Sequence, residues 1–406
     1  MASKVPEIRF AGFEGDWDKL PLSEYLTTSK AKNRDNTFGK EDVLSVSREF
    51  GVINQIEYQG RSFAGASVTG YGIAETNDII YTKSPLRDQP YGIIKTNKGV
   101  PGIVSALYAI YHPNDNIEPD FIQTFFDKDK RLNDYLRPLV HKGAKNTLNV
   151  GDDEAILGNV IFPKRDEQVK ITESFKNIDA LISHQVDVCE KLRNLRAALL
   201  TSLLPQGEET KPRVRLDGFT EAWTEKSLDE IITPYKEIVE TPHDGYDRLG
   251  IRSHGKGTFH SYVPKGAELE TAQMGVVRPN NLIVNITFGW ELAVAITEPS
   301  DEGKLVSHRF PQFSFKEKNV PIFFRYALIN NRFRKHLTLA SPGSAGRNRV
   351  LKIDKMLEYK MLVPAEKEQK AISDILSGYD RLIQLNEQKL DKLRNLKQAM
   401  LDKMFV

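Results

Sequence analysis

An internal repeat constrains the fold of this 406-residue chain more than any other feature. Residues 6–17 recur 206 positions later as residues 212–223, with proline, arginine, glycine, phenylalanine and tryptophan in step. A longer stretch, residues 163–204, recurs 201 positions later as residues 364–405. Self-similarity at two places in the same order indicates that one unit has been duplicated.

The residues between the matched ends do not repeat. Residues 18–162 and 224–363 are similar in length but share no obvious sequence. The chain therefore repeats a frame, which consists of residues 6–17 and 163–204 with their second copies. The residues between these stretches, which we call the contents of the frame, differ. The predicted segments are a first globular domain at 1–162 with its leading segment at 6–17, a central helix at 163–205, a linker and second globular domain at 206–363 with its leading segment at 212–223, and a C-terminal helix at 364–406.

The longer repeated stretch has the pattern of a helix with one apolar seam. Its apolar residues follow the four-three spacing of a coiled coil. Acidic residues follow Pro163 and Pro364, where they favour the helix dipole. Each helix should span about 36 residues, or roughly 55 Å. The predicted seam consists of Ile171, Phe175, Ile178, Ile182, Gln185, Leu192, Leu199, Ile372, Leu376, Tyr379, Ile383, Asn386, Leu393 and Met400.

Polar residues interrupt both seams at matching places. Gln185 and Asn386 share one such position, and Arg196 and Lys397 share another. Because each helix has a partner in its own chain, we expect the two to form an antiparallel intramolecular coiled coil, with the polar positions fixing the register. The alternative is that each helix folds onto its own globular domain.

Both globular parts have mixed patterns. Residues 43–53 and 78–83 alternate apolar with polar residues, which predicts strands. The second part has strand patterns at 281–286 and 292–296 and a helical pattern at 321–330. The expected fold class is α+β, with two mixed α/β domains separated by two long helices in a pseudo-twofold internal repeat.

Composition excludes several classes of protein. Lysine and arginine total 57 against 55 acidic residues, a net charge of +2, so any basic surface must be local. A single cysteine, Cys189, cannot form an internal disulfide, which favours a reducing cytoplasm. No run of 18 uncharged apolar residues and no metal-ligand spacing of histidines occurs, so we expect neither a membrane span nor a bound metal.

Residues 250–258 contain the G-x-x-x-x-G-K core of a phosphate-binding loop. Gly257 occupies the position at which that loop needs a serine or threonine for magnesium, and residues 259–263 alternate like a strand. A nucleotide-binding enzyme is therefore the less favoured interpretation. We expect a basic turn between strands that contacts nucleic acid, or a plain solvated turn. The predicted contacts in it are Arg252, His254 and Lys256.

Small-residue, basic segments occur late in each globular part, at 141–146 and 341–349. Such segments suit loops that order on a phosphate backbone, and arginine and asparagine can also read base edges. A generic surface loop is the alternative. The further predicted DNA-binding residues are Ser47, Arg48, Lys83, Lys142, Lys145, Asn146, Ser344, Arg347, Asn348 and Arg349.

With these features together, the whole chain resembles the specificity subunit of type I restriction-modification systems. The resemblance rests on residues of the repeated frame and on two basic segments. These are Gly12-Phe13 with Trp17, Gly218-Phe219 with Trp223, Pro163 with Glu167-Gln168, Pro364 with Glu368-Gln369, the Lys-Leu-Arg-Asn-Leu motifs at 191–195 and 392–396, and residues 249–259 and 343–349.

The resemblance implies a non-catalytic subunit with two target-recognition domains, each reading one half of an asymmetric bipartite site in double-stranded DNA. It implies that the paired helices set the spacer and dock two methyltransferase subunits, with two restriction subunits or, in a methylation-only system, none. The chain lacks the Asn-Pro-Pro-aromatic motif and a complete ATPase loop, so S-adenosylmethionine, ATP and magnesium are expected on the partners. A coiled-coil adaptor that does not bind DNA is the alternative.

Overall fold

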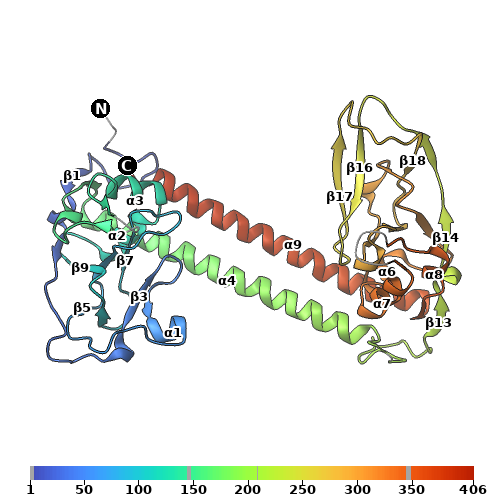
Figure 1. Ribbon diagram of the computed structural model, residues 1–406, viewed down its shortest axis with the longest axis horizontal. Coiled ribbons are helices and arrows are strands. Elements are labelled where there is room, and N and C mark those ends of the chain that lie inside the picture. Colours follow the sequence, from blue (N-terminus) through green and yellow to red (C-terminus); the bar gives the residue numbers. More distant parts are fainter. Residues whose placement is uncertain (1–3, 144–147, 208, 344–348) are drawn as a thin grey trace. The chain divides into compact units, whose positions relative to one another are not determined.

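The computed structural model describes residues 4–143, 148–207, 209–343 and 349–406. The chain forms two compact units (Figure 1): unit 1 consists of Met1–Asp187 and Gln388–Val406, and unit 2 consists of Val188–Glu387. Each unit takes one half of each long helix. The boundaries of the four predicted segments stay a prediction.

Two long helices carry the repeated frame. Helix α4 spans Arg165–Leu203 (39 residues) and helix α9 spans Glu366–Lys403 (38 residues). Both begin shortly after the repeated proline, with two acidic residues in the first turn, where they compensate the helix dipole. Pro205 follows the end of α4 and cannot continue it.

The two helices run antiparallel inside each unit. In unit 1 the Phe175 ring of α4 lies 5.9 Å from the Phe405 ring just past the end of α9, and Asp179 pairs with Lys397. In unit 2 Arg193 pairs with Glu387 and Arg196 with Asp380. Residue numbers rise along one helix as they fall along the other, so the expected intramolecular antiparallel pairing is confirmed.

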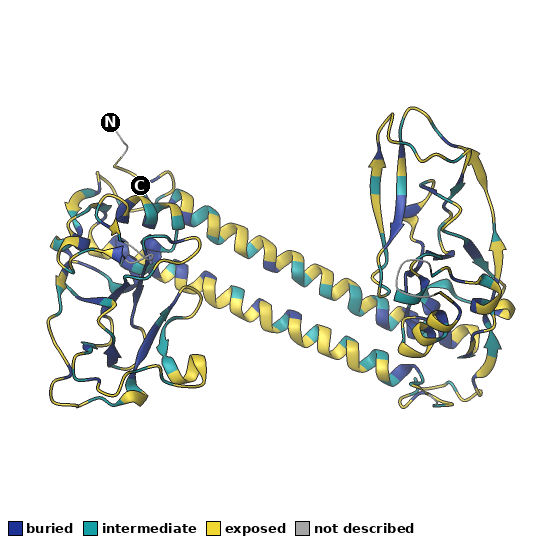
Figure 2. Ribbon diagram, viewed as in Figure 1, coloured by how far each residue is buried: buried dark blue, intermediate teal, exposed yellow. Residues whose placement is uncertain are grey.

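Burial along the helices follows the apolar spacing (Figure 2). All fourteen predicted seam residues are buried or half-buried, including the polar Gln185 and Asn386. The ends of the helices also enter the globular cores: Ile171, Phe175 and Ile178 belong to the core of unit 1. Each helix therefore packs both on its partner and on the globular part of its unit.

Within the described residues, unit 1 adds short antiparallel sheets and three short α-helices to its parts of α4 and α9. Its four-stranded sheet has the order β2 (Leu26–Thr28), β9 (Tyr108–Pro113), β6 (Ile79–Thr82), β7 (Ile93–Thr96). Two-stranded pairs are β1 (Asp18–Pro21) with β12 (Asn159–Phe162), β3 (Leu44–Ser47) with β4 (Gly51–Asn54), β5 (Gly72–Ala74) with β8 (Gly102–Val104), and β10 (His141–Lys142) with β11 (Leu148–Asn149). The helices are α1 (Gln55–Gln59), α2 (Pro119–Phe126) and α3 (Asp129–Leu136).

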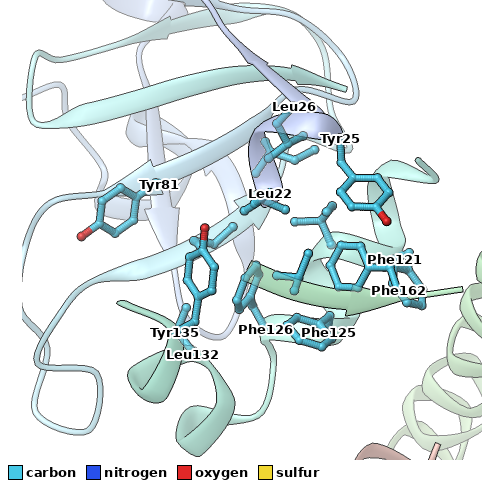
Figure 3. Close-up of a cluster of buried hydrophobic side chains, with 14 of the residues drawn as sticks. Leu22, Tyr25, Leu26, Tyr81, Phe121, Phe125, Phe126, Leu132, Tyr135 and Phe162 are labelled. Atoms are coloured by element: carbon cyan, nitrogen blue, oxygen red, sulfur yellow. The ribbon is translucent and has the colours of Figure 1, made fainter. Parts of the chain in front are cut away.

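The core of unit 1 is rich in aromatic side chains (Figure 3). Phe162 of β12 contacts Phe121 and Phe125 of α2 edge-on at centroid distances of 5.0 and 4.9 Å. Edge-on contacts are a preferred arrangement of aromatic pairs. Phe405, which follows α9, lies 5.8 Å from Phe125, so the C-terminal repeat helix is tied into the first unit.

Unit 2 has the same style with different contents. One sheet has the order β14 (Ile232–Tyr235), β22 (Gln312–Phe315), β19 (Leu282–Val284), β20 (Val294–Ile296). Another has the order β15 (Ile238–Glu240), β18 (Gln273–Val276), β21 (Leu305–Val306), β16 (Tyr246–Ile251), β17 (Thr258–Val263), and β13 (Thr224–Ser227) pairs with β23 (Lys360–Val363). The helices are α5 (Leu228–Ile231), α6 (Pro321–Ala327), α7 (Asn331–Leu339) and α8 (Ile353–Leu357).

The expected strands form, with one difference. Residues 43–53 are not one extended run, because the chain turns after Ser47 and returns as β4. The Ser47 hydroxyl accepts hydrogen bonds from the amides of Glu49 and Phe50 and so stabilises the turn. The helical pattern at 321–330 produces α6, which ends at Ala327.

The described residues offer neither a membrane-spanning helix nor a cluster of metal ligands. None of the helices described is long and apolar enough to cross a membrane. Nor does the described part of the chain contain a group of three or more histidine, cysteine, aspartate or glutamate residues placed to hold a metal ion.

Candidate nucleic-acid interface

Two ion pairs, each with a buried carboxylate and a half-buried arginine, hold the repeated frame together. The Arg9 guanidinium donates to both Glu167 carboxylate oxygens at 2.7 Å, and Arg215 donates to both oxygens of Glu368 at 2.9 and 2.8 Å. The carboxylates are only 3% and 2% exposed. The hydrogen bonds to these carboxylates raise the pKa of Arg9 and Arg215 above the ordinary value. Each pair joins a leading segment to the first turn of a long helix.

The neighbouring glutamines anchor a second helix in each unit. The Gln168 side-chain oxygen accepts from the Glu118 amide at 2.8 Å, directly before α2, and Gln369 accepts from the Val320 amide at 2.8 Å, directly before α6. Each glutamine also donates to the carbonyl oxygen of its repeated proline at 2.9 Å. The frame therefore fixes where α2 and α6 begin.

The repeated glycines and tryptophans complete the frame. Gly12 and Gly218 have φ values of 92° and 87°, a backbone region that strongly favours glycine. Trp17 and Trp223 follow them into the two cores. The matched residues of the sequence repeat thus do the same work in both units.

The matched charged positions of the seam form equivalent ion pairs. Lys397 lies 2.6 Å from Asp179 in unit 1, and Arg196 pairs with Asp380 in unit 2. Unit 2 adds Tyr326, whose hydroxyl donates to Asp380 at 2.8 Å. Burial, and secondarily this hydrogen bond, raises the pKa of Tyr326.

Helix α7 presents the most distinctive charged surface of unit 2. Phe333 and Leu337 bury one face of the helix, and the Asn330 side chain caps it by accepting from the Phe333 amide at 2.8 Å. The opposite face exposes Arg334 and Lys335. Among the described residues, neither lies within ion-pair distance of a carboxylate. The helix itself contains no acidic residue.

The glycine-rich turn lies against the same region. It joins β16 to β17, with Ile251 paired to Thr258. The His254 amide donates to the Glu291 carbonyl at 2.8 Å and the Gly255 amide to the Leu292 carbonyl at 2.9 Å. The expected basic turn between strands is therefore present. A phosphate-binding loop needs a helix after it, and β17 stands there instead.

Two hollows flank the exposed face of α7. One has a volume of about 850 Å³ and the other about 520 Å³. His254, Arg334 and Lys335 line both. The helix is therefore a basic ridge between two depressions, a shape that can approach an anionic polymer.

In the described part of unit 1, the predicted DNA-binding residues already have partners within the unit. Arg48 pairs with Asp88 and Asp129, and Lys83 pairs with Asp152. The Lys142 ammonium lies 4.8 Å from the centroid of the Tyr91 ring. Ser47 is buried in its turn. These residues stay predictions as DNA contacts.

In unit 2 the described predicted contacts have separate surroundings, and only His254 lines the hollows beside α7. Arg252 lies 5.2 Å from the Phe259 ring, and Arg349 lies 5.4 Å from the Trp290 ring. Lys256 lines a separate cavity of about 290 Å³. Five predicted contacts lie outside the described residues: Lys145, Asn146, Ser344, Arg347 and Asn348.

The sequence reasoning missed α7. Its signal was present in residues 331–339, where three basic residues interleave with Phe333 and Leu337 four positions apart. That spacing predicts a helix with one buried and one basic face. It could have been recognised beside the two glycine-containing segments.

A family model matches part of unit 2 and α9. Residues 269–395 match the model described as "Type I restriction modification DNA specificity domain". The matched range contains the Glu368-Gln369 anchor, helix α7 and most of α9.

A curated relative agrees with this match. The chain is 21% identical over 270 residues to the type I restriction enzyme MjaVIII specificity subunit of Methanocaldococcus jannaschii. The match covers 62% of this chain and 62% of the relative, which is less than two thirds of the length of either protein.

Two solved structures share the fold. The S subunit of a type I restriction-modification system from M. genitalium superposes with a TM-score of 0.55 at 14% identity, covering 99% of both chains. A chain from a structure described as the structural basis of complex assembly and conformational transition of the type I R-M system superposes with a TM-score of 0.50 at 13% identity, covering 96% of this chain and 97% of that one. The family model and the curated relative agree with the resemblance expected from the sequence: the chain is similar to specificity subunits of type I restriction-modification systems.

Proposed function

We propose that this chain is the non-catalytic, DNA-reading subunit of a type I restriction-modification enzyme. Its two globular parts each read one half of an asymmetric, bipartite site in double-stranded DNA. The adenine methylation and the DNA cleavage belong to partner subunits.

The proposal rests on one observation: the same ion pair anchors two globular parts that differ in sequence and in their strands and helices. Arg9 with Glu167 and Arg215 with Glu368 make the same bidentate contact, whereas the strands and helices between these anchors differ in order and length. One palindromic site would suit two copies of one reader. A repeated frame with different contents suits two different half-sites.

The charge distribution favours a reader that works with partners. The net charge of +2 provides little global attraction to DNA, and within the described residues of unit 1 the cations Arg48, Lys83 and Lys95 are paired with acids. Phosphate contacts supply most of the sequence-independent affinity of a DNA-binding protein. We infer that two methyltransferase subunits, docked on α4 and α9, contribute many of those contacts.

The partners would also bring the cofactors. S-adenosylmethionine is assigned to the methyltransferase subunits, and ATP with magnesium to two restriction subunits, which a methylation-only system would lack. The single cysteine supports the prediction that the complex works in a reducing cytoplasm.

The paired helices provide a physical basis for the spacer between half-sites. At 1.5 Å per residue, helices of 39 and 38 residues are about 58 Å long. One turn of DNA is roughly 34 to 36 Å. Each helix is therefore longer than one turn of DNA, which is long enough to set the spacing between two half-sites on one duplex.

Methylated adenines mapped on DNA treated with the full complex would test the function. Replacing residues 18–162 by the corresponding domain of another family member should change one half-site and leave the other half-site and the spacer intact. A change in both half-sites would contradict modular reading.

Helix length provides a second arm of the same experiment. Inserting four residues into α4 and four at the matching place in α9 adds about 6 Å, or one to two base pairs at 3.4 Å each. The spacer should lengthen by that amount while both half-sites stay the same. An unchanged spacer would contradict the proposed role of the helices.

A further inference from the structure

An exposed leucine lies at the end of the basic ridge of unit 2. Leu339, the last residue of α7, is 83% exposed. It lines the 520 Å³ hollow together with Arg334, Lys335, Thr338 and Trp290. A large apolar side chain that is so exposed would gain stabilisation if another surface covered it.

The surroundings of Leu339 indicate the chemistry of that surface. Arg334 and Lys335 stand one turn before Leu339, and among the described residues neither has a carboxylate within ion-pair distance. Among the described residues that line the hollow, Glu291 is the single acidic one, and the Ser253 hydroxyl donates to it at 2.6 Å. A surface complementary to Leu339 and these two cations would be anionic around an apolar point.

The major groove of DNA has this combination. Phosphates line its edges, and the C5-methyl group of thymine is its one apolar feature, which small and apolar side chains contact. The groove is wide enough to admit an α-helix. A protein partner would need both an acidic rim and an apolar residue at its centre. A thymine in the major groove presents its methyl group between flanking phosphates without any such special arrangement.

We propose that α7 is the base-reading helix of unit 2, with Leu339 contacting the methyl group of one thymine and Arg334 and Lys335 binding the flanking phosphates. This inference rests on the proposed function and adds to it the element and the residue that read one position of the second half-site.

Uracil substitution isolates the methyl contact. The full chain, assembled with its methyltransferase subunits, is first used to select its site from duplexes with a randomised window. Each thymine of the half-site assigned to unit 2 is then replaced singly by uracil, which keeps every hydrogen-bonding group. At one position the wild-type complex should bind about fourfold more weakly, the loss expected for one buried methyl group.

Leu339→Ala should remove this discrimination. The variant complex should bind the thymine and uracil duplexes equally, because the side chain that contacts the methyl group is gone. Leu339 is exposed, so the variant should fold, which circular dichroism verifies. Leu107→Ala removes a leucine of unit 1 that is 60% exposed, and should leave the uracil effect unchanged.

Arg334→Gln distinguishes phosphate binding from base reading. It should weaken binding to all sequences alike. The slope of log affinity against log salt concentration should fall by about one, as for the loss of one phosphate contact, while the fourfold uracil effect persists. A change of base preference instead would contradict the assigned division of roles.

Failure of the inference can be told apart from failure of the function. A wild-type complex that selects a bipartite site, but shows no uracil effect or keeps it in Leu339→Ala, overturns the role of Leu339 and leaves the function standing. If Leu339→Ala lowers only the assembly with methyltransferase, the covering surface is a protein and the inference is wrong. A complex that selects no site overturns both.

Discussion

Helix α3 follows α2 in unit 1, and helix α7 follows α6 in unit 2. A repeated glutamine fixes the start of α2 and of α6, but α3 and α7 use their charged residues in opposite ways. On α3, Asp134 accepts from Lys130 and Arg137, and the half-buried Arg131 donates to the carbonyl oxygens of Phe125 and Leu401. Burial lowers the pKa of Arg131 to about 10. On α7, Arg334 and Lys335 have no carboxylate within ion-pair distance among the described residues.

The difference separates structural from available charge. The cations of α3 hold the end of α9 against unit 1, since Lys128 also pairs with Asp402. On α7 Arg332 lies over the Tyr359 ring, whereas Arg334 and Lys335 form no ion pair within the described residues. A pair of helices that the frame positions identically can therefore serve packing in one unit and recognition in the other.

The largest expected effect tests whether the frame is equivalent in both units. Trp17→Ala and Trp223→Ala should each lower the free energy of unfolding by about 3–5 kcal/mol, as truncation of a buried tryptophan does. Trp223 is 9% exposed against 1% for Trp17 and should give the smaller loss. Urea denaturation of the full chain measures both, with Leu107→Ala as the control. A loss confined to one variant would show that the repeated tryptophans are not equivalent.

The glutamine anchors give the next effect. Gln168→Ala leaves the Glu118 amide and the Pro163 carbonyl without their partner and should cost about 1–3 kcal/mol; Gln369→Ala should cost about the same. The substitution Gln168→Glu sharpens the test. Its carboxylate would face the carbonyl oxygens of Asn116 and Pro163, to which the Gln168 amide donates.

The pH dependence of Gln168→Glu has a definite sign. Those carbonyl oxygens raise the folded-state pKa of the new carboxyl above its unfolded value, so its protonated form is favoured in the fold. Stability is then retained at low pH and lost as pH rises through the raised pKa. The variant should be less stable at pH 8 than at pH 5, relative to the parent chain. Equal losses at both would contradict the assigned orientation of the amide.

Much of this frame could be predicted from the sequence, and the reason is physical. Arg9 and Arg215, or Gln168 and Gln369, were recognisable because the same contact needs the same residue twice. The seam was predictable because its spacing is local. The engagement of Lys83 by Asp152, or of Lys128 by Asp402, was not, because these partners lie 69 and 274 positions apart. The candidate interface depends on which cations lack partners, and only the fold determines that.

The contrast between α3 and α7 predicts a smaller effect on DNA binding. Lys335→Gln should weaken binding of the assembled complex about fivefold to tenfold at 0.1 M salt and lower the salt slope by about one. Lys130→Gln is the matched control, because Lys130 already pairs with Asp134 at 2.9 Å. Binding titrations over a range of salt concentrations measure both. Equal effects of the two substitutions would remove the distinction between structural and available charge.

The smallest effect concerns the seam. Asp179→Asn and Asp380→Asn remove equivalent acids, but Asp380 accepts from Tyr326 as well as from Arg196, whereas Asp179 pairs with Lys397. Half-exposed ion pairs contribute about 0.2–1 kcal/mol, and the added hydrogen bond should place Asp380→Asn at the upper end and Asp179→Asn at the lower. Denaturation at low and high salt should show the Asp179→Asn loss fading as salt rises, while part of the Asp380→Asn loss persists, because a hydrogen bond from a buried hydroxyl is screened less than a pair of exposed charges. If the two losses are equal and fade together, Tyr326 does not strengthen the seam, and the two units differ only in the surfaces that they present.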